Sequence, residues 1–231
     1  MALILSIETT TEICSIAISK DGKCIHSIID GDKNSHSQKL ILYIEEAFQM
    51  LDLKKETLDA VAVSNGPGSY TGLRIGMSTA KAICYALDKP LISLSTLHAL
   101  AHGYSEKTDI PEKEYFIIPM IDARRMEVFT CIINQNMEEI EPISAKILDE
   151  NSFSKELNKP CFFIGNGAEK CNDLFGNHPN AHFPDVLASA EHLISMAEIA
   201  FKNNDFVDIA YCEPFYLKEY IAGKPNVKGL R

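Results

Sequence analysis

Residues 65–76 read NGPGSYTGLRIG, between an apolar run at 58–63 and a helical pattern that continues to about residue 87. A glycine-rich turn between a strand and a helix indicates a tight bend or a close approach of the backbone to another group. The spacing excludes two phosphate-binding motifs. A dinucleotide fingerprint requires G-x-G-x-x-G, whereas the glycines here are at 66, 68 and 72. A P-loop requires a lysine at the end of the turn, and the first lysine after it is Lys81.

The helix that follows this turn carries small residues at every fourth position, which are Gly72, Gly76, Ala80 and Cys84. Such a stripe lies on one helical face and allows another element to approach closely. Because a glycine inside a helix costs about 1 kcal/mol relative to alanine, close packing is the expected compensation. The stripe predicts either a partner-binding helix, with Arg74 as a candidate anion contact, or a contact inside the protein. The pattern alone favours the internal contact.

The same motif carries a resemblance to a known family. GPGSYTGLRIG at 66–76, followed by PLISLS at 90–95, resembles the signature of the TsaB (YeaZ) family. Weaker matches fall in the expected order at IETTT (7–11), HS (36–37), DARRMEV (122–128) and PFYL (214–217), so the resemblance covers nearly the whole chain. TsaB is the bacterial subunit of the tRNA threonylcarbamoyladenosine machinery and a non-catalytic relative of TsaD.

Composition favours an ordinary globular protein. The chain has 231 residues, of which 46% are hydrophobic and 23% charged. Its seven cysteines are an odd number without a C-x-x-C pair, which indicates reduced thiols and a cytoplasmic location. The N-terminal residues do not resemble a signal peptide, and no apolar run has the length of a membrane span.

The net charge of −10 argues against a broad nucleic-acid surface. The basic tail at 218–231 is the exception, for which a solvated terminus is favoured over an RNA contact.

The elements expected along the chain repeat in order. In the first half, strands are expected at 3–8, 14–20 and 23–30, then a helix at 37–53, a strand at 58–63, the helix at 72–87 and a strand at 91–94. In the second half, strands are expected at 115–121, 127–133, 139–147 and 161–164, with a short helix at 151–157, a helical stretch after 165–167 and a longer helix at 188–203. Each half has the order β-β-β-α-β-α.

This repetition indicates an α/β protein of two similar units, although a chance likeness between the halves is the alternative. The resemblance implies that the units are lobes of the actin/Hsp70/sugar-kinase (ASKHA) class, with the second lobe reduced. We expect a first lobe with partner-binding helices at 1–104, a second, smaller lobe at 111–210 and a C-terminal tail at 211–231. A linker is expected at 102–114, where Gly, Ser, Thr, Asp and Pro cluster.

In that class, nucleotide phosphates lie against turns from both lobes, and backbone N–H groups must face the anion. The first turn here is ETTTE at 8–12, with two carboxylates and no glycine or lysine. The second is GNG at 165–167, which is a better cradle but too short to be diagnostic. The candidate nucleotide or anion contacts are Thr9, Thr10, Gly165 and Gly167. No cofactor is predicted, and ATP or ADP at a subunit boundary is left open.

No metal site is predicted either. His98 and His102 have the i, i+4 spacing of metal ligands. TsaD carries an H-x-x-x-H metal motif in this region, but counted from Pro90 it would fall on Thr96 and Leu100. A displacement of two residues turns the histidines by about 200° around a helix.

Catalytic residues are not identified. Cys14, Cys84 and Cys131 lie in apolar runs and are expected to be core thiols. Ser69 does not sit in G-x-S-x-G. Asp122, Arg124 and Arg125 end a predicted strand and form a candidate ion-pair cluster, either structural or partner-binding.

The resemblance therefore implies a non-enzymatic accessory subunit. It would support TsaD in transferring the threonylcarbamoyl group to N6 of adenosine 37 in tRNAs reading A-starting codons. TsaE would be a further component of the complex, and the chain would contact tRNA only indirectly. Without TsaD, the chain would be able to form homodimers. The alternatives are an active actin-like ATPase or phosphotransferase and, less favoured, a metalloprotease. The predicted partner-binding residues are Leu40, Ile44, Tyr70, Leu73, Arg74, Gly76, Met77 and Ala80.

Overall fold

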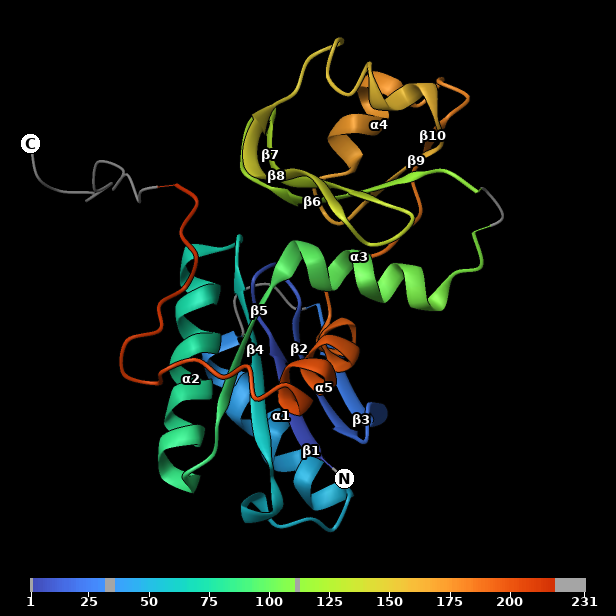
Figure 1. Ribbon diagram of the computed structural model, residues 1–231. Helices are drawn as coiled ribbons and strands as arrows, with labels where there is room; N and C mark the ends of the chain where they lie inside the picture. Colours follow the sequence, from blue (N-terminus) through green and yellow to red (C-terminus); the bar gives the residue numbers. More distant parts are fainter. Residues whose placement is uncertain (1, 32–35, 111–112, 219–231) are drawn as a thin grey trace, which may run out of the picture.

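The computed structural model describes residues 2–31, 36–110 and 113–218. Figure 1 shows two lobes, each built on one mixed β-sheet, with helix α3 (Thr96–Lys107) lying between them. The basic residues of the expected tail beyond Lys218 lie outside the described residues.

The first lobe is a five-stranded sheet in the order β3-β2-β1-β4-β5, antiparallel at β3-β2-β1 and parallel at β1-β4-β5. Its elements are β1 Leu3–Glu8, β2 Cys14–Lys20, β3 Lys23–Asp30, α1 His36–Met50, η1 Lys55–Thr57, β4 Ala60–Gly66, α2 Tyr70–Leu87 and β5 Leu91–Ser95. The β2–β3 hairpin turns at Asp21 and Gly22, both with positive φ, as a two-residue turn requires.

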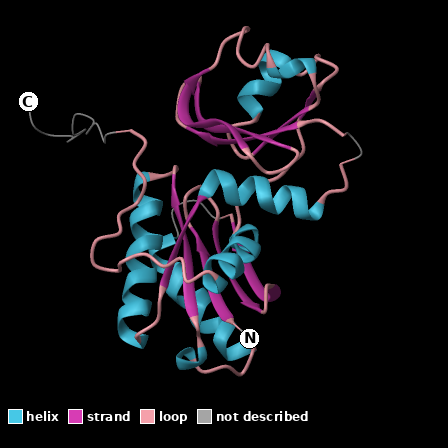
Figure 2. Ribbon diagram, viewed as in Figure 1, coloured by secondary structure: helices cyan, strands magenta, loops and turns pink. Residues whose placement is uncertain are grey.

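Helices cover both faces of this sheet, as Figure 2 shows. On one face, α1 and α2 pack with β1, β2, β4 and β5 around residues such as Leu5, Ile16, Val61 and Phe48. On the other face, the alternate residues Ile4, Ala60 and Ala62 contact the last helix of the chain. Because both faces are covered, β1 and β4 are almost entirely buried and read as continuous apolar runs.

The second lobe repeats this topology. Its sheet order is β10-β9-β6-β7-β8, which reversed matches β3-β2-β1-β4-β5 strand for strand, so the predicted duplication is confirmed. The elements are β6 Phe116–Asp122, β7 Glu127–Asn134, β8 Glu139–Ile147, η2 Glu156–Asn158, β9 Cys161–Ile164, α4 Glu169–Phe175 and β10 Ala181–His182. The lobe is reduced, because β10 has two residues and turns with η2 replace the expected helix at 151–157.

Helix α3, Thr96–Lys107, corrects the first part of the predicted linker, because 102–107 are helical. Its Leu97, Leu100 and Tyr104 belong to the core of the second lobe, while Ala99 belongs to the core of the first. Gly103 allows α3 to pack closely against His192, because a Cβ at position 103 would overlap the ring of that histidine. Gly103 and Ser105 thus belong to a helix packed between two sheets, whereas 108–110 lie outside it.

After the second lobe the chain returns to the first. The 3-10 helix η3 Ala190–Leu193 and helix α5 Ile194–Lys202 pack on the first sheet through Leu193, Ala197 and Ala200. The following segment, 205–218, runs back along β5 and α2, where Val207 bridges Leu91 and Phe215 N donates to Asn65 O at 2.7 Å. We propose the division into a first lobe at 1–104, a second lobe at 111–210 and a tail at 211–231. Residues 190–202 fall in the second range, but they contribute to the core of the first lobe.

Among the described residues, none of the helices has the length and apolar character needed to span a membrane.

Candidate functional site

The turn between β1 and β2 lies against the NGPGSYTG stretch. Ser69 N donates to Thr10 O at 2.7 Å, and Thr9 Oγ1 donates to Gly72 O at 2.8 Å. A Cβ at Gly68 would overlap Thr10 O, and one at Gly72 would overlap Thr9 O. The glycines therefore serve a close approach inside the chain, which is the internal contact that the pattern alone favours.

Thr9 and Thr10 are consequently buried, and this corrects their assignment as anion contacts. Thr10 donates its backbone N–H to Glu8 Oε1 at 2.6 Å and its hydroxyl to the same oxygen, while Ser64 Oγ donates to Glu8 Oε2. Burial raises the pKa of the Glu8 carboxyl above its usual range, against the opposing effect of these hydrogen bonds. A buried acid thus occupies the turn where the fold class would hold a phosphate.

The second candidate cradle is also internally satisfied. Gly165 N donates to Val186 O at 2.9 Å, and Gly167 N donates to Met120 O at 3.2 Å. Gly165 has φ +96°, and a Cβ there would overlap Met120 O. Since both N–H groups have partners within the lobe, they are not directed at an anion, and the prediction for Gly165 and Gly167 is corrected as well.

The two turns touch each other through Asn166. Its Nδ2 donates to Glu12 Oε2 at 2.8 Å, and its Oδ1 accepts from Asp122 N at 3.0 Å. A side-chain hydrogen bond therefore joins the two turns across the boundary of the lobes. The residues present do not fit a nucleotide phosphate.

Burial also corrects most of the predicted partner-binding set. Six members of the set are buried within this chain: Leu40, Ile44, Leu73, Gly76, Met77 and Ala80. Segment 205–218 covers part of this face, because Cys212 Sγ lies 3.9 Å from Met77 Sδ. Periodicity identified the apolar face correctly, but the protein itself covers it.

Tyr70 and Arg74 are the more accessible members of the set, and they contact the same segment. The Arg74 guanidinium lies 4.2 Å from the Tyr70 ring centroid, and Arg74 Nε donates to Tyr216 Oη at 3.2 Å. The Tyr70 and Tyr216 rings are 5.1 Å apart. Arg74 thus joins α2 to the C-terminal segment in this structure.

The apolar side chains that α1 and α2 leave exposed were missed by the sequence interpretation. On α1, Ile41 is 46% exposed and Leu42 59% exposed. Ile41 and Ile83 of α2 line an apolar groove between the two helices, which Glu45 and Lys55 also line. The available signal was that Leu42 departs from the core-facing positions 40, 44, 47 and 48 of the same helix.

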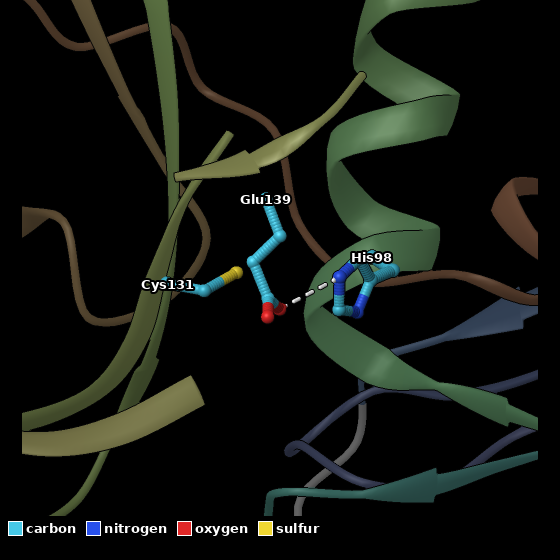
Figure 3. A group of neighbouring side chains, drawn as sticks. All are labelled: His98, Cys131 and Glu139. Carbon is cyan, nitrogen blue, oxygen red and sulfur yellow. Dashed lines mark ion pairs between the residues drawn. The ribbon is translucent and has the colours of Figure 1, made fainter. Parts of the chain in front are cut away.

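In the interlobe region, His98 and Asp122 each pair with a charged side chain. His98 Nε2 lies 3.0 Å from Glu139 Oε2, close to Cys131 (Figure 3). His102 is not part of that group, and burial lowers its pKa. Asp122 forms its ion pair with Lys170 at 3.1 Å, not with the arginines of its own turn.

Thr96 and Leu100, the positions of the H-x-x-x-H motif, are buried and offer no metal ligand set. The cysteines predicted to be core thiols are buried, as expected. Burial raises the pKa of Cys14 to about 11 and those of Cys84 and Cys131 to about 12. These thiols are therefore poor nucleophiles.

The fold has two sheets of identical topology, with helices on their faces and a connecting helix between them. This is the architecture of the actin/Hsp70/sugar-kinase class. In this chain, the turns that would hold phosphate in that class are hydrogen-bonded to each other. The family model of TsaD, tRNA N6-adenosine threonylcarbamoyltransferase, matches residues 31–222. The chain belongs to this family, and within it to the TsaB (YeaZ) group.

Relatives and solved structures support this assignment. The tRNA threonylcarbamoyladenosine biosynthesis protein TsaB of Escherichia coli (strain K12) is 27% identical, over 96% of each chain. TsaB of Bacillus subtilis (strain 168) is 28% identical, over 93% of each chain. The structure of YeaZ from Pseudomonas aeruginosa superposes with a TM-score of 0.73 at 24% identity, covering 94% of this chain and all of the other, and it supports the fold.

Proposed function

We propose that this chain is a non-catalytic accessory subunit in tRNA threonylcarbamoyladenosine biosynthesis. It supports a TsaD enzyme in transferring the threonylcarbamoyl group to N6 of adenosine 37. Full-length similarity to TsaB proteins supports the pathway. The observation that carries the non-catalytic role is the Asn166–Glu12 hydrogen bond between two turns whose polar groups are already paired.

The proposed partner is TsaD, with TsaE joining the larger complex and tRNA contacted through TsaD. The surface we propose for TsaD is the exposed face of α1 and α2 around the groove of Ile41 and Ile83. Exposed apolar side chains beside one another favour a protein contact, because their burial stabilises a complex. The same face is proposed to form homodimers when TsaD is absent.

We also propose a cytoplasmic location. The substrate of the pathway is tRNA, and all seven cysteines of this chain are free thiols, as is usual in a reducing compartment.

The test is reconstitution of the tRNA modification. Purified TsaD and TsaE receive tRNA and threonylcarbamoyl-AMP, with and without this chain, and the chain alone serves as the control. We expect modified tRNA when all three proteins are present, and little or none when this chain is omitted. Equal modification without the chain would overturn the accessory role, and modification by the chain alone would overturn its non-catalytic part.

The actin-like ATPase alternative is tested on the isolated chain. ATP turnover that is lost in the Glu8→Gln variant would favour it. We expect no turnover above that of a buffer blank, because Glu8 and its partners fill the turn that would bind phosphate.

A further inference from the structure

Three side chains with metal-binding chemistry meet at the boundary of the lobes. His98 comes from α3, Cys131 from β7 and Glu139 from the start of β8. Figure 3 shows the imidazole and the carboxylate facing each other, with the thiol pointing toward the carboxylate. One ligand atom of each residue lies within 4.8 Å of the others, and His98 Nε2 is 3.0 Å from Glu139 Oε2. Within the described parts of the chain, this is the one such group.

The β7–β8 ladder is irregular at this point. Thr130 pairs with Ser144 but Ile132 pairs with Glu141, so Pro142 and Ile143 together face Cys131. Proline has no N–H to give to the ladder, which explains the bulge, and bulges redirect side chains. The irregularity therefore lies opposite Cys131.

The group has a buried side and an open side. Cys131 is buried among apolar residues of the interlobe core, including Leu97 and Phe129. Glu139 is exposed and His98 partly exposed, so an ion can enter from solvent and keep a water ligand. The open side leaves room for the fourth, non-protein ligand of a zinc site that has three protein ligands.

We propose that His98, Cys131 and Glu139 form a Zn²⁺ site. Thiolate, imidazole and carboxylate are the three protein ligand types of zinc, at about 2.0–2.3 Å. Binding forms bonds from Zn²⁺ to Cys131 Sγ, His98 Nε2 and a Glu139 carboxylate oxygen, and the thiol proton passes to solvent. The ion replaces the direct His98–Glu139 contact and ties α3 to two strands of the second lobe.

This site is distinct from the H-x-x-x-H motif of TsaD. That motif would fall on Thr96 and Leu100, and His98 lies two positions from either, which is about 200° around the helix. The other two ligands come from the second sheet. The proposal does not depend on the proposed function in tRNA modification.

The test uses the full chain, with any affinity tag removed and metal stripped by a chelator. Titration with Co²⁺ is followed by visible and near-ultraviolet absorption, and Zn²⁺ is then added as competitor. We expect one equivalent of Co²⁺ to bind with a thiolate-to-metal charge-transfer band, and Zn²⁺ to displace it. Absence of that band, or its persistence under excess Zn²⁺, would overturn the proposal.

Variants then assign the ligands. Since loss of even an outer-shell partner costs about 10–100-fold in metal affinity, we expect at least about 100-fold weaker binding in His98→Gln, Cys131→Ser and Glu139→Gln. The matched controls are His102→Gln, Cys24→Ser and Glu138→Gln, which change the same residue types outside the group. Equal loss in the controls, or unchanged affinity in Glu139→Gln, would overturn the assignment. Glu139 is exposed, so its variant remains informative if Cys131→Ser does not fold.

Discussion

Asn166 Nδ2 donates a hydrogen bond to Glu12 Oε2 at 2.8 Å, and this contact joins the β9–α4 turn of one lobe to the β1–β2 turn of the other. The same side chain accepts from Asp122 N at 3.0 Å, so one amide connects both lobes and the end of β6. Asn166 therefore fixes the position of the β9–α4 turn relative to the β1–β2 turn.

Replacing Asn166 by alanine is expected to lower the free energy of unfolding by about 1–2 kcal/mol, because two hydrogen bonds are lost and Asp122 N is left without its acceptor. Urea denaturation measures the change. Asn151→Ala, at an exposed turn residue, is the control and is expected to change little. Equal stability of Asn166→Ala and wild type would show that the interlobe bond contributes nothing.

The glycines of α2 give a second prediction. In Gly76→Ala the new Cβ overlaps Thr9 Oγ1, which is itself bonded to Gly72 O. The clash is expected to cost about 1–3 kcal/mol and to outweigh the gain of about 1 kcal/mol in helix propensity. Ala82→Leu, on the exposed side of the same helix, is the control. If thermal or urea unfolding finds Gly76→Ala more stable, the close approach is not required.

The buried acid Glu8 predicts a dependence of stability on pH. Its folded-state pKa is raised by burial above the unfolded value of 4.5, so the folded state binds the proton more tightly. Between the two pKa values stability therefore falls as pH rises, by about 1.4 kcal/mol for each pH unit. Glu8→Gln lacks this loss.

Urea denaturation of both proteins from pH 5 to 8 isolates the effect of Glu8, since other groups cancel in the difference. We expect the stability of Glu8→Gln relative to wild type to increase with pH and then level off. A difference that is flat over this range would contradict the raised pKa.

His192 predicts the opposite slope. Burial lowers its pKa to about 4 from an ordinary 6.5, and its Nδ1 has no hydrogen-bond partner among the described residues. The unfolded state therefore binds more protons between these values, and stability falls on the order of 3 kcal/mol as the pH drops from 6.5 to about 4. The contribution is fully present above pH 6.5.

In His192→Leu this acid-dependent loss is expected to disappear, while the control His178→Gln, at an exposed histidine, should keep it. The measurement is the slope of unfolding free energy against pH. Parallel profiles for wild type and His192→Leu would rule out the assignment.

Local patterns were sufficient for most elements but not for α3. The strands at 3–8, 14–20 and 23–30 have the predicted bounds, because short apolar runs and the Asp21-Gly22 turn are local signals. Gly103 and its polar neighbours look like a linker in the sequence. Gly103 is helical nevertheless, and it is glycine because His192, from a distant segment, occupies the space of a Cβ. A contact of that kind has no local signature.

The candidate site was harder to predict for a related reason. Periodicity shows that Leu73 and Met77 lie on an apolar face, but it does not say whether a partner or the protein's own segment 205–218 covers that face. The turn residues Gly165 and Gly167 likewise match a phosphate cradle in composition. Their N–H groups are paired with Val186 and Met120, and only the fold brings those carbonyls near.

The last prediction concerns the proposed TsaD surface. Ile41→Glu places a charge at the groove between α1 and α2, on a side chain that is 46% exposed. The free chain should keep its stability, while its affinity for TsaD should fall at least about 10-fold, since the charge must lose water on binding. Ile147→Glu is the control, with an even more exposed isoleucine on β8 of the other lobe.

Calorimetric titration of TsaD with each variant measures the affinity, and the reconstituted tRNA modification is expected to fall in parallel. Two results would argue against this surface. If Ile147→Glu weakens binding as much as Ile41→Glu, the loss of affinity comes from the change in net charge and not from the position of the new carboxylate. If Ile41→Glu binds like wild type while modification still requires the chain, the accessory role stands but TsaD must bind another face.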